Sequence, residues 1–259
     1  MTGSGSRTPN VGRIYDALLS GKDNFAEERE AARRLIAAIP DVVAGARANR
    51  EFLGRAVQFL AGEAGIRQFL DIGAGLPTMG NSHAASREVT PDARVAYVDI
   101  DPVVISHAQG LLGKNPEVRA ILGDLRDPAG ILDHPDLRAH IDLRQPTAIL
   151  LVAVLHFVPD EEAFQAVSVL KDAMAPGSYL VVSHGTSDNL SHDAVAEMQQ
   201  VYGDATAPAV PRTEDGIARF FDGLQMVPPG LCDVGAWRAA PGPGQPGRVL
   251  FLGGIGRKQ

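Results

Sequence analysis

The sequence has few of the features that mark membrane, secreted or nucleic-acid-binding proteins. It contains one cysteine in 259 residues, so no internal disulfide can form. Its longest apolar run, 148–155, is less than half as long as a membrane-spanning helix requires. Acidic residues outnumber basic ones, 31 against 24, and the net charge of −7 would repel a phosphate backbone. We therefore expect a cytoplasmic protein that binds neither membranes nor nucleic acid.

Metal-site spacings are also missing. The seven histidines and the cysteine do not stand at the i, i+4 or C-x-x-C spacings of zinc sites, which predicts no structural metal. The sequence does contain an ordinary globular share of hydrophobic residues, 45%, together with 28 glycines and 18 prolines. These numbers predict one or two domains with many loops, and they indicate no oligomeric state.

The first quarter of the chain has a helical pattern. Residues 1–10 are polar, lack the apolar stretch of a secretory signal, and are predicted to be a disordered lead-in. Residues 11–65 are predicted to form three helices that make a cap over the rest of the molecule. Asn24 and Glu27 form a capping-box pattern at the start of the second helix, and Asp41 is expected to cap the third.

From residue 66 the pattern changes to short apolar runs that alternate with helical stretches, which is typical of a parallel sheet. We predict one α/β domain over 66–259, with a Rossmann-like mixed sheet of seven strands and helices on both faces. A Pro/Gly-rich hairpin loop is expected at 241–247, between the last two strands. The predicted strands are 68–72, 94–99, 118–122, 147–154, 178–183, 231–237 and 249–252, and the helices between them are 81–89, 102–112, 160–174, 189–202 and 213–221.

The first predicted strand ends in a glycine-rich turn that is typical of a nucleotide-type site. In the run Asp71-Ile72-Gly73-Ala74-Gly75, glycine allows a tight turn and a close approach of the backbone to a ligand, although any strand-to-helix turn can use it. Asp99 ends the next strand, near the offset of roughly 20 residues at which an acid holds ribose hydroxyls. Asp101, before Pro102, is a normal helix cap.

A third acid, Asp124, follows the third strand. Its carboxylate could accept a hydrogen bond from an adenine amino group, or cap a turn before Asp127 and Pro128. The glycine turn and the three acids together resemble the class I S-adenosylmethionine-dependent methyltransferases, over about residues 70–254. A dinucleotide-binding dehydrogenase is the rival interpretation, but Thr78 stands where its fingerprint requires a third glycine.

The sequence is similar over nearly its whole length to an actinobacterial family of S-adenosylmethionine methyltransferase-like proteins. The segments that carry this resemblance are 9–16, 21–25, 48–50, 71–78, 155–160 and 178–184. The resemblance implies S-adenosylmethionine as the cofactor, and it implies cofactor contacts by Asp71, Gly73, Ala74, Gly75, Asp99, Ile100, Asp124, Leu125 and Ala153.

Other polar residues of these segments are candidates for the rest of the site. Tyr15, Lys22, Asn24 and Arg50 could cover the cofactor and pair with its carboxylate, while the alternative is an N-cap by Asn24 and a solvated Lys22. Thr213, after Arg212, is expected to cap a helix.

Methyl transfer needs positioning more than a catalytic side chain, but it can use a base. His156 and His184, each after a strand at the ligand-binding edge, are the candidate bases; each could instead have a structural role in its loop. We therefore predict a methyltransferase that acts on an unidentified small molecule. The alternatives are a non-catalytic ligand-binding protein of the same fold and, third, an NAD-dependent dehydrogenase.

Overall fold

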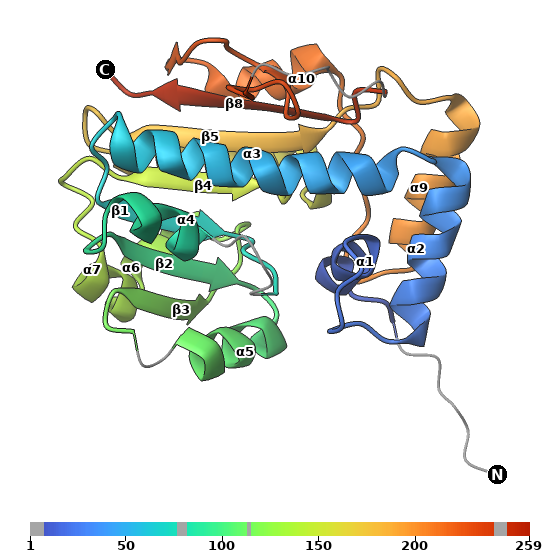
Figure 1. Ribbon diagram of the computed structural model, residues 1–259, viewed down its shortest axis with the longest axis horizontal. Helices are drawn as coiled ribbons and strands as arrows, with labels where there is room; N and C mark the ends of the chain where they lie inside the picture. The colour runs from blue at the N-terminus through green and yellow to red at the C-terminus, as the bar shows by residue number, and fades with distance from the viewer. Residues whose placement is uncertain (1–7, 77–81, 113–114, 241–247) are drawn as a thin grey trace.

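The protein is built around one mixed sheet. The computed structural model describes residues 8–76, 82–112, 115–240 and 248–259. Within them eight strands form the order β3-β2-β1-β4-β5-β8-β6, with β7 paired to β8 (Figure 1). The strands are β1 (Gln68–Ile72), β2 (Arg94–Asp99), β3 (Val118–Leu122), β4 (Ala148–Val152), β5 (Tyr179–Gly185), β6 (Gln225–Met226), β7 (Cys232–Asp233) and β8 (Phe251–Arg257).

The first five strands run parallel, and β8 runs antiparallel to β5. All residues of β1 are buried, as the near-continuous apolar run at 68–72 predicts for a strand covered on both faces. The chain passes from β1 to β2 on one side and from β4 to β5 on the other, so the strand order reverses between β1 and β4. Ligands of open α/β sheets bind at such a point, outside the carboxyl ends of the strands.

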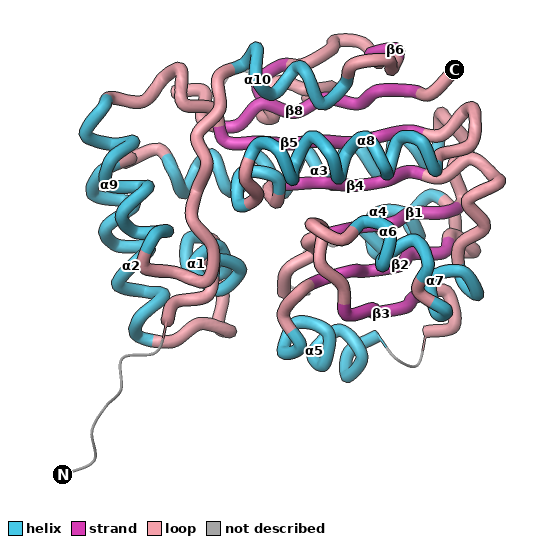
Figure 2. Tube along the Cα trace, turned by 180° about the vertical axis from the view of Figure 1, so that it is seen from behind, coloured by secondary structure: helices cyan, strands magenta, loops and turns pink. Residues whose placement is uncertain are grey.

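Helices cover both faces of the sheet. Figure 1 shows α3 and α4 on one face, and Figure 2 shows α6, α7 and α8 on the other. The buried side of α3, which includes Phe52 and Leu60, shares a hydrophobic cluster with Phe69 of β1 and Leu150 of β4. The helices of this part are α3 (Val42–Gly62), α4 (Ser82–Val89), α5 (Pro102–Leu112), α6 (Pro128–Asp133), α7 (Pro135–His140), α8 (Asp160–Ala173) and α10 (Glu214–Ala218).

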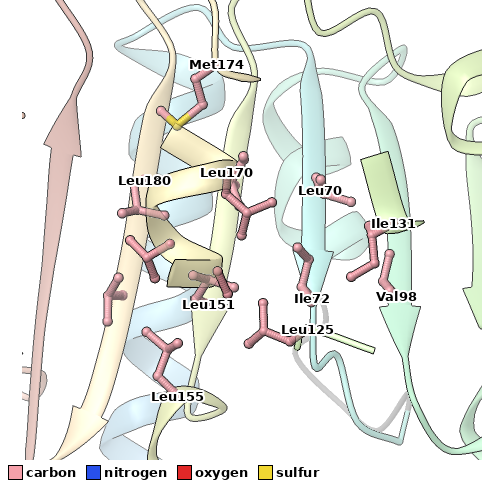
Figure 3. Close-up of a cluster of buried hydrophobic side chains, with 14 of the residues drawn as sticks. Leu70, Ile72, Val98, Leu125, Ile131, Leu151, Leu155, Leu170, Met174 and Leu180 are labelled. Carbon is pink, nitrogen blue, oxygen red and sulfur yellow. The ribbon is translucent and has the colours of Figure 1, made fainter. Parts of the chain in front are cut away.

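The opposite face carries the other large hydrophobic cluster. Figure 3 shows Leu70 and Ile72 of β1 beside Leu151 of β4, with Leu170 of α8 packed on them. Leu125, just after β3, lies at the carboxyl end of the same cluster, so apolar packing holds the loops of the sheet edge in place. Loops that are held by a packed sheet in this way can position the residues of a binding site.

A second group of helices lies beyond the carboxyl ends of the strands (Figures 1 and 2). It consists of α1 (Val11–Leu18), α2 (Ala26–Ala38) and α9 (His192–Gly203). Ile14, Leu35 and Val201, one from each helix, are almost fully buried in their common hydrophobic cluster. The sequence separates α9 from α1 and α2 by most of the chain, and only the tertiary structure brings them together.

The mixed α/β sheet is confirmed, with differences in its second half. The predicted bounds of β1, β2 and β3 are correct to the residue, but the sheet has eight described strands and not seven. The predicted strand 231–237 shrinks to two residues of β7, because the chain turns at 235–237, and the last strand begins at Phe251 and not at 249. The short helices α6 and α7 were not expected. The hairpin loop predicted at 241–247 lies outside the described residues.

Two of the predicted helix caps are wrong, and part of the lead-in is ordered. The second helix begins one residue later than predicted, and the Glu28 carboxylate accepts the Phe25 N–H at 2.9 Å. Asp41 precedes α3 but makes no capping hydrogen bond, because its backbone is already helical. Asn10, predicted to be disordered, caps α1 by accepting the Arg13 N–H at 3.1 Å.

Candidate functional site

A cavity of about 560 Å³ opens at the carboxyl ends of β1, β2, β3 and β4. Its volume is in the range of small-molecule sites, and its position is the point where the strand order reverses. Most of the residues predicted to contact a cofactor line it. They are Tyr15, Arg50, Asp71, Gly73, Ala74, Gly75, Asp99, Ile100, Asp124, Leu125 and Ala153.

The glycine turn joins the ends of three strands at the floor of this cavity. Gly73 has a φ of 74°, and its N–H donates to the Val98 carbonyl at the end of β2 at 2.8 Å. A β-carbon at this position would overlap the side chain of Val154, which follows β4. Glycine is therefore required here both by the left-handed backbone and by the close approach of β4.

Asp99 is held in place by backbone amides. Its Oδ2 accepts the Gly75 N–H at 2.9 Å and its Oδ1 accepts the Asp101 N–H at 2.9 Å. Burial raises the pKa of Asp99, while these two amide bonds act in the opposite direction. Each carboxylate oxygen keeps a further lone pair, so the group can accept two more hydrogen bonds from a ligand in the cavity.

Asp71 forms the buried end of a hydrogen-bonded network. Ser82 Oγ donates to Asp71 Oδ2 at 2.8 Å and lies 3.0 Å from the Tyr97 hydroxyl, which also accepts the His83 N–H. Burial raises the pKa of Asp71 to about 6, although the Ser82 bond and the nearby Arg50 guanidinium favour the ionised form. A carboxylate whose charge is costly because it is buried is well suited to a cationic ligand.

Asp124 lies on the cavity, but its carboxylate has a partner from the protein. Arg126 Nε donates to both carboxylate oxygens at 3.0 Å, and the Arg126 backbone N–H donates to Oδ1 at 2.9 Å, an arrangement that lowers the pKa of Asp124. Asp124 therefore bonds to the turn that follows it, which was the alternative to a role in binding adenine. Ile100 is 56% exposed and presents an apolar surface to the same end of the cavity.

Ala153, after β4, adopts a left-handed conformation with a φ of 55°, which is unusual for a residue with a side chain. Its N–H donates to both the carbonyl and the hydroxyl oxygen of Ser183, at 3.1 Å each. Ser183 Oγ in turn donates to Asn49 Oδ1 at 2.5 Å, and Asn49 Nδ2 donates to the Tyr15 hydroxyl at 3.0 Å. This network ties α1 and α3 to the ends of β4 and β5 around the cavity.

The prediction that Lys22 and Asn24 cover the cofactor is not supported by their positions, because neither lines the cavity. Lys22 is exposed, and the Asn24 side chain faces inward, where its Nδ2 donates to Asp16 Oδ2 at 2.8 Å. The Asp23 N–H donates to the same oxygen at 3.0 Å. The segment 21–25 thus wraps around the buried Asp16 carboxylate, and its polar residues hold the loop rather than a ligand.

We expect Gly21→Ala to destabilise the protein by about 1–3 kcal/mol, because overpacking of a buried site costs that much. A β-carbon at Gly21 would overlap the Asp16 carboxylate, which would have to leave its bonds to residues 23 and 24. Urea unfolding measures the change. The control is Gly54→Ala, where a β-carbon meets nothing within 4 Å, and where alanine in helix α3 should be neutral or stabilising. Equal effects of the two variants would contradict this interpretation of the loop.

The structure does not place either candidate base on the cavity. His184 is fully buried; its Nε2 accepts from Arg212 Nη1 at 2.8 Å, and its Nδ1 lies 2.7 Å from the Gly185 carbonyl. Burial lowers the pKa of His184 to about 4 and holds the pKa of His156 well below its usual value. His184 therefore acts as a neutral structural acceptor, and the His156 ring lines a separate apolar cavity of about 80 Å³.

Arg212, only 5% exposed, fastens the turn after β4 that carries both His156 and the cavity residue Phe157. Its guanidinium donates at 2.8 Å to the Leu155 carbonyl and at 2.8 Å to the Val158 carbonyl, in addition to His184. It also pairs with Asp160, whose side chain is largely exposed. The next residue, Thr213, caps α10 as predicted.

Arg212→Met should lower the free energy of unfolding by about 2–3 kcal/mol, since two buried carbonyls and a ring nitrogen lose their donors. Chemical denaturation of both proteins at pH 7.5 gives the difference. Arg219→Met is the matched control: this exposed guanidinium stacks on Phe164 at 4.2 Å, a contact worth about 1 kcal/mol or less. If Arg212→Met lowers the free energy of unfolding no more than Arg219→Met does, the hydrogen bonds of the buried Arg212 guanidinium contribute little to stability.

Three functional positions had no role assigned from the sequence. Asn10 and Arg13 of the first helix donate to Asp101 Oδ2, at 3.0 and 3.3 Å, and so join α1 to the end of β2. Asp101 also caps α5 by accepting the Val103 N–H at 2.8 Å, as predicted. Phe157 lines the cavity from the turn after β4. Their presence in the segments 9–16 and 155–160 was the only signal in the sequence.

The described residues offer neither a membrane-spanning helix nor a metal site. None of the described helices is long and apolar enough to cross a membrane. No group of three or more His, Cys, Asp or Glu side chains in residues 8–76, 82–112, 115–240 and 248–259 is arranged to hold a metal ion.

The fold and the cavity define an α/β protein with a small-molecule site at the carboxyl edge of its sheet. Residues 4–259 match the model of the S-adenosyl methyltransferase family, and the chain belongs to this family. The cofactor of the family is S-adenosylmethionine.

Solved structures and a curated relative agree with this assignment. A candidate methyltransferase from Thermobifida fusca is 42% identical, with a TM-score of 0.92 over 97% of this chain and 96% of that chain. A DUF574 family protein from Streptomyces avermitilis is 39% identical, with a TM-score of 0.91 over 97% and 98%. A candidate S-adenosylmethionine-dependent methyltransferase from Mycobacterium bovis is 32% identical over 139 residues, which is 51% of this chain and 40% of that protein. The matched region is thus less than half of this curated relative.

Proposed function

We propose that the protein binds S-adenosylmethionine in the cavity at the carboxyl edge of the sheet and transfers its methyl group to a small molecule. The observation that carries the proposal is the joint position of Asp71, the Gly73 to Gly75 turn and Asp99 on one cavity at the reversal of the strand order. When bound, the cofactor supplies a methyl group on a cationic sulfur. The membership of the chain in the S-adenosyl methyltransferase family supports the same function.

The residues of the cavity fit the parts of this cofactor. Asp99, with lone pairs left over from its amide bonds, is suited to two ribose hydroxyls. Asp71 and Arg50 offer a carboxylate and a guanidinium for the ammonium and carboxylate of the amino-acid part. Ile100 and Leu125 offer apolar surface for the adenine ring, and Asp124 is the candidate acceptor for its amino group.

In such a reaction the protein mainly holds the nucleophile in line with the methyl group and excludes water. The network Tyr15–Asn49–Ser183 fixes the wall of the cavity, and the Tyr15 hydroxyl also donates to the Ala46 carbonyl at 3.0 Å. Buried and hydrogen-bonded groups of this kind already hold their positions before a ligand binds. Such a preorganised site can promote an in-line displacement without a catalytic side chain.

The finer layout belongs to the same proposal. We regard the sheet and its helices as Rossmann-like, and residues 11–65 as one compact unit with the domain 66–259, in which α1 and α2 cap the carboxyl edge while α3 packs on a face of the sheet. The bonds from Asn10 and Arg13 to Asp101 support this cap, since they hold α1 against the cavity. A cytoplasmic location remains part of the proposal.

Isothermal titration calorimetry with S-adenosylmethionine and S-adenosylhomocysteine tests the cofactor assignment. We expect saturable binding of both, and no heat at millimolar ligand would overturn the proposal. A parallel titration with NAD(H) tests the dehydrogenase alternative, which predicts binding of that cofactor instead. Product formation from a labelled methyl donor, scanned across cell extracts, separates an enzyme from a ligand-binding protein that keeps only the fold.

A further inference from the structure

The charges that line the cavity are unequal. Its described residues include five carboxylates and three guanidinium groups, and no lysine, histidine or glutamate side chain. The lining is therefore net negative when all of these groups are ionised. Such a cavity attracts cations and disfavours anions. The groups are Asp16, Asp71, Asp99, Asp101 and Asp124, with Arg13, Arg50 and Arg126.

Each of the three guanidinium groups is engaged by the protein. Arg13 lies 3.3 Å from Asp101 and 4.0 Å from Glu28, and Arg126 is paired with Asp124. Arg50 interacts with Asp71 electrostatically and lies 5.8 Å above the Tyr15 ring. An anionic molecule that accepts the methyl group would have to compete with these carboxylates for a guanidinium group. It would also compete with the carboxylate of the cofactor, which we propose pairs with Arg50.

Six uncharged residues of the lining come from three segments. We call them the uncharged wall: Val11 and Gly12 of α1 with Leu19 just after it, Val154 and Phe157 of the turn after β4, and Ala207. The first and last of these segments are joined, because the Val11 N–H donates to Thr206 Oγ1 at 3.2 Å and the Thr206 N–H donates to the Pro9 carbonyl at 2.9 Å. Phe157 presents an aromatic ring that is 5.1 Å from the Tyr202 ring. The wall suits a small apolar molecule with an aromatic ring.

Among the described residues of the cavity no histidine or lysine offers a base to such a molecule, and each of the five aspartates already accepts hydrogen bonds from the protein. Tyr15, the phenol of the described lining, already donates its proton to Ala46, and burial raises its pKa. Neither His156 nor His184 reaches the cavity. A nucleophile that reacts through a lone pair without first losing a proton fits this site better than an alcohol or a phenol.

We propose that the methyl acceptor is an uncharged aromatic amine or nitrogen heterocycle held against the uncharged wall; this inference rests on the proposed function. The nitrogen lone pair forms the new N–CH₃ bond while the C–S bond breaks and its electron pair stays on sulfur. The positive charge moves from sulfur to nitrogen and remains in a net negative cavity. Transfer to an anionic acceptor would instead remove this charge from among the carboxylates. With an N–H amine, the extra proton leaves to water after transfer.

Three probes of matched shape test the acceptor class: para-ethylaniline, para-ethylphenol and para-ethylbenzoate. Their binding to the protein saturated with S-adenosylhomocysteine is measured by calorimetry, and their methylation by labelled S-adenosylmethionine is measured by mass spectrometry. We expect para-ethylaniline to bind about tenfold or more tighter than para-ethylbenzoate, and to be the probe that is methylated. Preference for the phenol or the benzoate, or no binding of the amine to the saturated protein, overturns the inference.

A charge placed on the wall gives an independent readout. Ala207→Lys should improve binding of para-ethylbenzoate about tenfold over Ala207→Met, a variant of similar length without the charge. Unequal affinities support the electrostatic argument, and equal affinities of the two variants contradict it. If the unmodified protein does not bind S-adenosylhomocysteine at all, the proposed function fails; if it does and the benzoate is preferred, only this inference fails.

Discussion

Asp99→Ala is expected to weaken binding of S-adenosylmethionine by about 10- to 1000-fold, because each hydrogen bond to a charged group contributes about 1.5–3 kcal/mol. The carboxylate is oriented by the N–H groups of Gly75 and Asp101, so the variant removes both the proposed ribose acceptor and the group that holds the glycine turn. Calorimetric titration of the wild-type and variant proteins measures the loss.

Two further variants separate these contributions. Asp99→Asn keeps one carbonyl oxygen and should lose less affinity than alanine. Asp92→Ala removes an exposed carboxylate at the other end of the same strand and should leave the affinity unchanged. An Asp99→Ala protein that is folded and binds with wild-type affinity would show that a different acid holds the ribose.

Asp71→Asn should change stability and cofactor affinity in opposite directions. Burial raises the pKa of Asp71 from 3.8 to about 6, and one pKa unit corresponds to about 1.4 kcal/mol, so ionisation in the folded state costs up to about 3 kcal/mol. Asparagine removes this cost and can still accept from Ser82 Oγ. Without the carboxylate, the cofactor cation loses its partner, and we expect affinity to fall about 10- to 100-fold.

The pH dependence gives the sign of the stability effect. A carboxyl group whose pKa is raised by folding contributes stability below its unfolded pKa, and this contribution is lost as the pH rises through the folded value. The advantage of Asp71→Asn should therefore be full at pH 7.5, well above 6, and should disappear below 3.8. Urea unfolding at pH 7.5 and 4.5 tests this, with the exposed Asp92→Asn as the control. A stability difference that is equal at both pH values would refute the role of the buried charge.

The sequence patterns predicted the elements that are determined locally. The strands predicted at 68–72, 94–99 and 118–122 became β1, β2 and β3 without a change of bounds, because short runs rich in apolar residues between turn signals have a strong local signal, even in the half-exposed edge strand β3. The two-residue strand β6 was not predicted and β7 was predicted too long, since each of them pairs only with β8 over two residues. The predicted caps of α2 and α3 were wrong because the residues that precede these helices, Phe25 and Asp41, make no side-chain capping hydrogen bond, and the exact start of a helix is not fixed by its local polar pattern alone.

The same division holds for the site. Asp71, Gly73 and Asp99 lie at the ends of two parallel strands, whose carboxyl ends meet at one edge of the sheet, so their common position could be predicted from their order. The roles of Asn24 and His184 could not, because each depends on a partner far away in the sequence or on burial: Asn24 binds Asp16, and His184 accepts from Arg212.

By itself, the sequence determined the α/β class, the positions of β1, β2 and β3 along the chain and the acids and glycines at their ends. Those features depend on local periodicity and on the rule that parallel strands share one carboxyl edge. Only the tertiary structure decided which polar residues face the cavity. It gathers α1, α2 and α9 beyond the sheet, joins Arg13 to Asp101, and buries His156 and His184 near Arg212, away from the cavity. The physical reason is that burial and long-range hydrogen bonds, which leave no periodic trace in a sequence, assign these side chains to the site or to the scaffold.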